Sequence, residues 1–291
     1  MPYFISFFML PIYAKYLSPE DYAIISLVTS LQVIVATVVS LQLNTALPRY
    51  YFDFDKTELT DYFSTLLISI LVLSLLFLAV FNLFGDLLIN FIYPRSAIPY
   101  SPYFQIMLLI ILFNQISLLC ERLLIVQERG KVVFIRSIFL SVIGLCSSVL
   151  FVIVLNLGAL GMIISLLLSS LMSMLLHLAL TRVYIRLIWT KKYFFKSLRY
   201  SAPLIPHAIG GYLFMYSDKL ILEKFVPLSQ LGLYAMADRI SMGFKALVNA
   251  VNNALNPNFN ALATEDLSNA VNKFEKIVTV WAVLILTIYL A

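Results

Sequence analysis

The sequence predicts an all-α, polytopic helical membrane protein. Of its 291 residues, 62% are hydrophobic and only 12% are charged, and the mean hydropathy is +0.94. A soluble domain keeps roughly a quarter of its residues charged, so much of the apolar surface of this chain must face lipid. The apolar residues also gather in blocks, most of them close to the ~20 residues that a helix needs to span a bilayer.

Eight apolar blocks follow one another, and a ninth begins near Ile277 and runs to Ala291. The ninth holds about 15 residues, fewer than a span requires, so we expect the set of helices to be truncated at this point. The predicted helices lie at about residues 1–17, 21–43, 65–84, 104–126, 132–155, 160–180, 203–222 and 232–255.

The Lys and Arg residues of the connecting segments predict the orientation. If the helices alternate strictly, fourteen of these residues lie on one side, which includes the segments after the second, fourth and sixth helices, and four lie on the other. Short loops rich in Lys and Arg stay in the cytoplasm. We therefore expect a multi-pass protein with a cytoplasmic N-terminus. Because the basic residues flank apolar blocks, the net charge of +5 does not predict nucleic-acid binding.

The longest basic connector, residues 182–199, follows the sixth helix. Its mixture of basic and aromatic residues is typical of an amphipathic helix on anionic lipid. The position of this connector divides the predicted protein into three parts: a six-helix N-terminal lobe at 1–181, a cytoplasmic connector at 182–202, and the start of a C-terminal lobe at 203–291.

Two similar segments support this division. Leu17–Ala23 and Pro227–Ala235 each contain a turn with Ser before Tyr-Ala, and Asn44–Pro48 resembles Asn253–Pro257 in the same order. An offset of six helices preserves orientation, as in transporters with parallel repeats. The sequence thus predicts a two-lobe transporter bundle with the second lobe truncated.

The eighth predicted helix carries a polar stripe. At 100° per residue its members share one face, with Arg239 at the edge. Ionisable groups at membrane depth usually face a bundle interior or a water-filled cavity, so we expect a cavity wall. The alternative is a cationic amphipathic helix on the membrane surface. The members of the stripe are Asp238, Lys245, Asn249, Asn252 and Asn256.

On the seventh helix, His207 and Asp218 are predicted to share one face. His207 is either a hydrogen-bonded packing residue or part of a proton relay. Asp218 belongs either to a charge cluster in the headgroup region, with Lys219 and Glu223, or to an ion-coupling site.

Three further charged residues lie near predicted helix ends on the basic side. Arg49 is either a topology anchor or a phosphate contact. Arg136 is expected to extend toward the headgroups. Glu121 is expected to pair with Arg122 beside a helix–helix hydrogen-bond set that includes Asn114 and Ser117.

Motifs of soluble catalysis are missing from the sequence. It contains no nucleotide-binding Gly-rich loop with Lys, no nucleophile elbow and no metal-ligand spacing. Cys120 and Cys146 lie within apolar blocks, where a thiol behaves as a small hydrophobe. We therefore expect no enzyme activity, no cofactor and no metal.

Four segments together resemble a known family. The chain is similar to the bacterial polysaccharide exporters, the O-antigen and capsule repeat-unit flippases of the multidrug/oligosaccharidyl-lipid/polysaccharide exporter superfamily. The similarity extends over the full length, and family members usually have twelve to fourteen spans. The segments that carry it are 197–207 (SLRYSAPLIPH), 216–222 (YSDKLIL), 10–22 (LPIYAKYLSPEDY) and 232–235 (GLYA).

The resemblance implies a flippase that moves undecaprenyl-pyrophosphate-linked oligosaccharides across the bacterial cytoplasmic (inner) membrane by alternating access. Polysaccharide polymerase and glycosyltransferases would be partners. Arg and Lys suit a desolvated pyrophosphate because they form charge-assisted hydrogen bonds. The expected substrate-binding residues are Arg239, Lys245, Asn249 and Arg49, and the expected ion-coupling residues are Asp218 and His207.

Two alternatives stay open. A multidrug or cation exporter of the same superfamily would place acidic groups in the cavity instead of Arg and Lys. An inactive fragment would serve only as a structural partner in a polysaccharide assembly machine.

Overall fold

The computed structural model describes residues 9–94, 98–243, 275 and 279. Residues 1–238 form one structural unit and residues 239–291 a second. Every regular element within the described residues is helical, which confirms the all-α class. The predicted boundary between lobes at the 182–202 connector stays a prediction.

The described part of the first unit contains six long helices, and a further helix begins at residue 228. Short helical turns connect them: η1 (Leu43–Thr45), α3 (Ala46–Tyr50), η2 (Tyr51–Asp53), η4 (Arg182–Tyr184) and α8 (Lys191–Ser201). The six long helices are α2 (Pro19–Ser40), α4 (Lys56–Ile92), α5 (Tyr103–Val126), α6 (Gly130–Ser148), α7 (Gly158–Thr181) and α9 (Leu204–Leu222), and α6 continues into the π-helical η3 (Val149–Val154).

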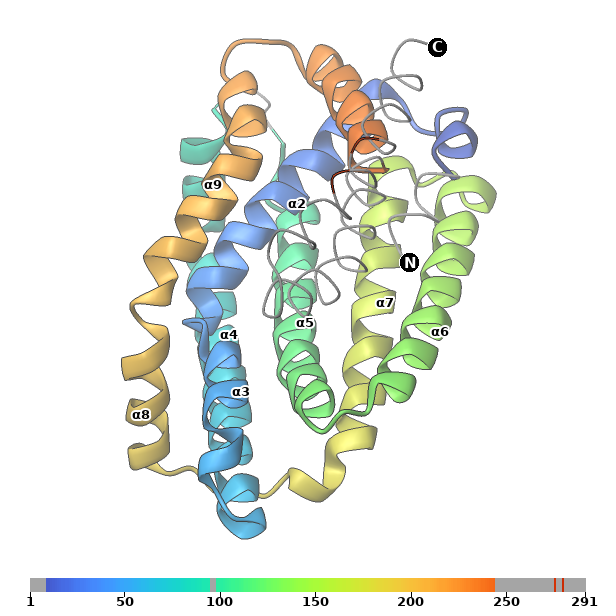
Figure 1. The fold of residues 1–291 in the computed structure, drawn as a ribbon. Coiled ribbons are helices and arrows are strands. Elements are labelled where there is room, and N and C mark those ends of the chain that lie inside the picture. Colours follow the sequence, from blue (N-terminus) through green and yellow to red (C-terminus); the bar gives the residue numbers. More distant parts are fainter. Residues whose placement is uncertain (1–8, 95–97, 244–274, 276–278, 280–291) are drawn as a thin grey trace. The chain divides into compact units, whose positions relative to one another are not determined.

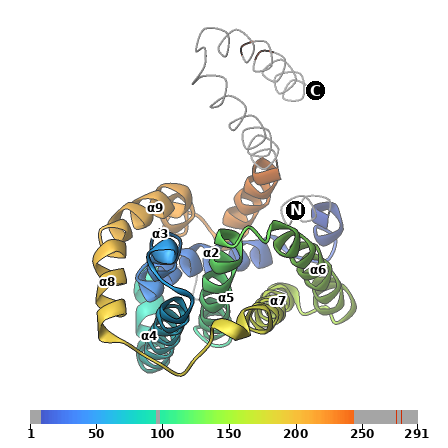
Figure 2. The ribbon, with the colours of Figure 1, turned by 60° about the horizontal axis from the view of Figure 1, so that its bottom comes forward.

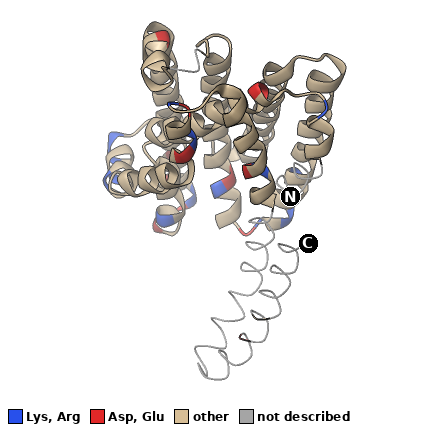
Figure 3. Ribbon diagram, turned by 90° about the horizontal axis from the view of Figure 1, so that it is seen from above, with Lys and Arg blue, Asp and Glu red and all other residues tan. Residues whose placement is uncertain are grey.

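Five of the described helices are long and apolar enough to cross a membrane. They are α2, α4, α5, α6 with η3, and α7 with η4. Most of the ribbon carries no charged residue (Figure 3). α9 has the predicted extent but is not among the five, because His207, Asp218 and Lys219 lower its hydropathy.

Successive long helices of the first unit run in opposite directions (Figure 1). The segments 41–55, 127–129 and 182–203 therefore meet at one end, which we call the basic end. Seen with this end forward, α5 lies between α4 and α7, and α6 packs on α7 (Figure 2). The predicted orientation assumes this alternation of helix directions.

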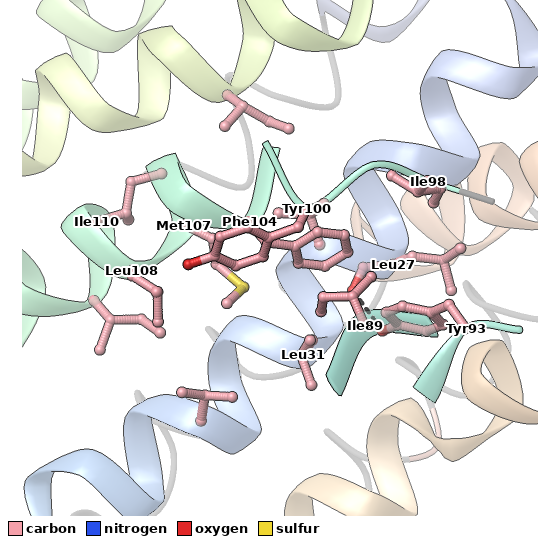
Figure 4. Close-up of a cluster of buried hydrophobic side chains, with 14 of the residues drawn as sticks. Leu27, Leu31, Ile89, Tyr93, Ile98, Tyr100, Phe104, Met107, Leu108 and Ile110 are labelled. Atoms are coloured by element: carbon pink, nitrogen blue, oxygen red, sulfur yellow. Dashed lines mark hydrogen bonds between the residues drawn. The ribbon is translucent and has the colours of Figure 1, made fainter. Parts of the chain in front are cut away.

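The core at the opposite end joins α2, α4 and α5 (Figure 4). Tyr93 stacks on Phe104, with ring centroids 5.9 Å apart, and its hydroxyl donates to the Leu27 carbonyl at 3.0 Å. Burial raises the pKa of Tyr93, and the negative charge of Glu223 raises it further. The hydroxyl therefore keeps its hydrogen and its bond to α2.

One carboxylate joins the N-terminal ends of α2 and α7. Ser18 and Asp21 form a capping box at the start of α2, and Asp21 Oδ1 also accepts from the Ala159 backbone N–H at 2.8 Å. Gly158 precedes Ala159 with φ +55°, and a Cβ on it would lie 2.8 Å from Asp21 Oδ1. Because N-terminal helix ends are positive, the Asp21 carboxylate stabilises two helices at once.

We expect Asp21→Ala to lower the free energy of unfolding by about 2 kcal/mol, because it removes a capping group from two helices. The measurement is thermal or denaturant unfolding of the purified protein. Glu20→Ala is the matched control, since it removes the same charge from the same turn at an exposed position. Equal effects of the two substitutions would contradict this role for Asp21.

The connector after α7 is bound to α4. Ser64 Oγ donates to the Tyr184 carbonyl at 3.2 Å and accepts from the Arg186 N–H at 2.8 Å. The Trp189 indole N–H donates to Ser69 Oγ at 3.0 Å. The predicted cytoplasmic connector is thus attached to the N-terminal part of the bundle.

The following helix, α8, is amphipathic and packs against α3 and α4. Tyr193 and Phe194 contact the core around α4, and Ser197 shares a 2.9 Å hydrogen bond with the Tyr62 hydroxyl. Lys191 and Lys192 lie on the exposed side. Part of the aromatic face therefore packs on protein, and contact of the basic face with anionic lipid stays a prediction.

Candidate functional site

A polar cluster joins α5, α6 and α7 inside the bundle. Arg136 of α6 donates from Nη2 to Glu121 Oε1 of α5 at 3.1 Å, and from Nη1 to Nε2 of His177 on α7. The Arg136 side chain is only 10% exposed and His177 is fully buried. An Arg at this depth is stabilised by its partners, because an unpaired charge is costly at membrane depth.

Arg136 Nη1 contacts both ring nitrogens of His177, Nε2 and, at 3.2 Å, Nδ1. Nδ1 also contacts Ser117 Oγ at 2.5 Å, and Ser117 contacts Ser173 Oγ at 2.5 Å. The three helices are joined by one continuous hydrogen-bond chain.

The prediction for Arg136 was wrong. Its side chain turns into the bundle instead of extending toward the headgroups, because Glu121 and His177 offer it acceptors there. The expected pairing of Glu121 with Arg122 was also wrong, since Glu121 binds Arg136. The expected helix–helix hydrogen bonds are confirmed for Ser117, whereas Asn114 is exposed and its part in the set stays a prediction.

A cavity of about 340 Å³ extends from Arg136 between α6 and α7. Its volume lies at the lower end of the range of about 300–1,000 Å³ that is typical of small-molecule sites. At its far end the Tyr13 hydroxyl contacts Ser148 Oγ at 2.5 Å. The lining is Met9, Tyr13, Arg136, Ser137, Leu140, Ser141, Gly144, Leu145, Ser148, Met162, Ser165, Leu166 and Ser169.

His177 and the serines of this cavity were not among the residues predicted from the sequence. A signal was present: Ser165, Ser169, Ser173 and His177 recur every four residues along α7, which places them on one helical face. A polar stripe in a span normally faces the bundle interior.

Arg49 lies in α3 at the basic end, where it is largely exposed. Its Nη1 is 4.0 Å from Asp53 Oδ1, and its guanidinium lies 5.3 Å from the Tyr50 ring centroid. Lys196 of α8 also contacts Asp53, at 3.3 Å, and lies over the Tyr50 ring. The structure thus places Arg49 in an exposed cationic and aromatic cluster.

The structure does not bring His207 and Asp218 together. They lie on α9, eleven residues apart in sequence, which corresponds to roughly 16 Å along a helix. Asp218 accepts from the Tyr234 hydroxyl at 2.5 Å, and the neighbouring Lys219 pairs with Asp238 at 2.6 Å. His207 is exposed. Their role in ion coupling stays a prediction.

The expected cavity wall on the eighth helix falls mostly outside the described residues. The part of the chain that is not described contains Lys245, Asn249, Asn252 and Asn256. Arg239 begins the second unit. Asp238, at the end of the first unit, is committed to its ion pair with Lys219.

The described residues offer hydrogen bonding and charge pairing, and they hold no group of three or more His, Cys, Asp and Glu suited to a metal ion. A family model described as polysaccharide biosynthesis protein matches residues 1–262 of the chain. Neither the search of curated proteins nor the search of solved structures returned a match.

Proposed function

This chain belongs to the polysaccharide biosynthesis protein family, and from that premise we propose that it is a lipid-linked oligosaccharide flippase. Its cargo would be undecaprenyl-pyrophosphate-linked repeat units, carried from the cytoplasmic to the outer leaflet of the bacterial cytoplasmic membrane. The basic end would then face the cytoplasm, in accord with its many Lys and Arg residues.

The cavity beside Arg136 is the observation that carries this proposal. The cavity combines serine hydroxyls with an Arg side chain that is only 10% exposed, and a polar cargo needs polar groups along its path through a bundle. An oligosaccharide is rich in hydroxyl groups, which hydrogen-bond to such a lining. Its lipid is apolar, as are the outward faces of the spans.

In the proposed mechanism the two lobes rock about the cargo by alternating access. Arg239, Lys245 and Asn249 would contact the pyrophosphate from the second lobe, and Arg49 would attract it at the basic end. Asp218 and His207 would couple transport to an ion gradient. Polymerase and glycosyltransferases are the expected partners.

Two of the inward carboxylates argue against a cation exporter. Such a protein needs carboxylates in the bundle that are free to bind a cation. Glu121 is bound to Arg136, and Asp238 is bound to Lys219 at 2.6 Å. These two inward carboxylates are therefore already neutralised.

Deletion of the gene from its host is expected to abolish surface polysaccharide. The lipid-linked repeat units should accumulate in the inner leaflet, because their synthesis continues while their movement stops. The measurement is polysaccharide on the cell surface, together with the fraction of lipid-linked oligosaccharide that an impermeant glycan-oxidising reagent reaches in spheroplasts.

Expression of the protein from a plasmid serves as the control and should restore both quantities. Unchanged surface polysaccharide after deletion would refute the proposal. Normal polysaccharide together with increased sensitivity to cationic dyes would instead support the exporter.

A further inference from the structure

The connector between α7 and α9 carries cations that the protein leaves unpaired. Residues 182–202 contain six Lys and Arg and no Asp or Glu. Arg186 pairs with Asp61 at 3.6 Å, and Lys196 pairs with Asp53 at 3.3 Å. The other four cations are exposed and form no ion pair with any described residue, so this surface is complementary to an anionic partner. These four are Arg182, Lys191, Lys192 and Arg199.

Large apolar side chains are exposed on the same segment. Leu187 is 97% exposed, and Trp189 and Phe195 are about half exposed. The ring of Phe195 lies among the unpaired cations, with its centroid 5.7 Å from Lys191 Nζ. Apolar side chains interleaved with cations are typical of a segment at a membrane interface, because the apolar groups meet the edge of the hydrocarbon while the cations meet the phosphates.

Hydrogen bonds to α4 set the depth of the connector. The Thr190 N–H donates to Thr65 Oγ1 at 3.2 Å, one residue before the apolar run of α4 begins at Leu66. The Trp189 indole N–H donates to Ser69, four residues further along α4 and therefore about 6 Å deeper. The backbone of the connector is thus level with the start of the apolar run, and the Trp189 ring extends below that level. Trp is enriched at this depth of a bilayer.

We propose that residues 182–199 form a binding surface for anionic phospholipid in the leaflet that meets the basic end. Lys191 and Lys192 bind the lipid phosphates, and Trp189 and Phe195 contact the acyl chains near their ester groups. The occupant is the bulk lipid of the membrane and not a transported cargo. The inference therefore does not depend on the proposed flippase function.

An acidic soluble protein matches this surface less well. It would pair with the cations, but the Trp189 ring lies beside the apolar run of α4, where Leu71 and Val72 are also exposed. Exposed apolar residues of a span face lipid, and a protein that stays in water does not reach that depth. An anionic lipid meets both the cations and the apolar side chains.

The test uses Trp189 itself as the reporter, because the chain has only one other tryptophan, Trp281. The full-length Trp281→Phe protein is reconstituted into phosphatidylcholine bilayers with a small fraction of brominated lipid, which quenches a tryptophan that it touches. Brominated phosphatidylglycerol should quench at a concentration about fivefold lower than brominated phosphatidylcholine, since one cation near the surface favours an anionic lipid by about this factor. Lys191→Gln/Lys192→Gln in this background should bring the two concentrations together.

Arg129→Gln/Lys131→Gln is the matched control, because it removes two exposed cations from the same end of the bundle, at the start of α6. It should keep the preference for the anionic lipid. Equal losses in the two double variants would overturn the proposal, because the preference would then reflect only the overall charge of the basic end. Equal quenching by the two lipids before any Lys is replaced would also overturn it.

Two further outcomes would assign the surface to another occupant and so overturn the proposal. Trp189 emission that neither brominated lipid quenches would mean that the connector lies outside the bilayer, where a soluble partner could cover it. Displacement of phosphatidylglycerol by far smaller amounts of undecaprenyl phosphate would mean that the surface binds the lipid carrier. Normal polysaccharide in the deletion strain would refute the flippase function and leave the preference of Trp189 for anionic lipid unchanged.

Discussion

Arg136→Met is expected to lower the free energy of unfolding by about 3 kcal/mol, the low end of the range for breaking a buried ion pair. The low end applies because Glu121 is 28% exposed and water can partly solvate it. The substitution leaves the Glu121 carboxylate and His177 Nε2 without their donor. Unfolding of the detergent-solubilised protein, followed by temperature or denaturant, measures the effect.

The double variant Glu121→Gln/Arg136→Met is the control, because it removes both charges together. We expect it to recover more than half of the lost stability, since replacing a whole buried pair is often close to neutral. A double variant as unstable as Arg136→Met would contradict the assignment of Glu121 as the ion-pair partner.

Gly232→Ala is expected to have a similarly large effect, about 3 kcal/mol, because the site has no room for a side chain. A Cβ on Gly232 would lie 1.7 Å from the Pro19 carbonyl oxygen. Backbone atoms cannot rotate away as a side chain can, so the helix that begins at residue 228 would have to move off the start of α2.

Gly210→Ala on α9 is the matched control, since a Cβ there meets no atom within 4 Å. It should leave stability unchanged or raise it by up to about 1 kcal/mol, because Ala favours helix. The same unfolding measurement compares the two variants. Equal stabilities would mean that the close approach at Pro19 is not required for the fold.

The fold could largely be predicted because hydropathy marks what faces lipid. The expected helices at 104–126 and 160–180 agree closely with α5 (Tyr103–Val126) and α7 (Gly158–Thr181). α4 extends well beyond the predicted 65–84, to Lys56–Ile92. Its 37 residues span about 55 Å, more than the ~30 Å of hydrocarbon, and its polar N-terminal turns carry no hydropathy signal.

The candidate site was harder to predict because it depends on pairing across helices. Arg136 lies near a helix start, where extension toward headgroups is the usual outcome. Glu121 lies five residues before the end of α5, and Arg136 lies six residues after the start of α6. In a tight helical hairpin these positions face each other, and this geometric signal was present in the sequence. The serine spacing of α7 marks the face that carries His177, but its contact with Arg136 depends on the packing of a third helix, which no local pattern gives.

The two segments whose similarity suggested a repeat lie against each other in the first unit. Gly232 of the second segment approaches the Pro19 carbonyl of the first, and Tyr22 and Ala235 belong to the same buried cluster. Sequence similarity alone could not reveal this contact, because it depends on the direction in which each helix leaves its turn.

Transbilayer movement of the cargo tests the central claim most directly. The protein is reconstituted into liposomes with its lipid-linked oligosaccharide, and an impermeant glycan-oxidising reagent reports the fraction exposed outside. The account predicts that this fraction rises from about half toward completion with the protein, and that Ser141→Leu, which fills the cavity, slows the rise while Ser147→Ala/Ser170→Ala, outside the cavity lining, does not. A fraction that stays at the level of protein-free liposomes would contradict the account.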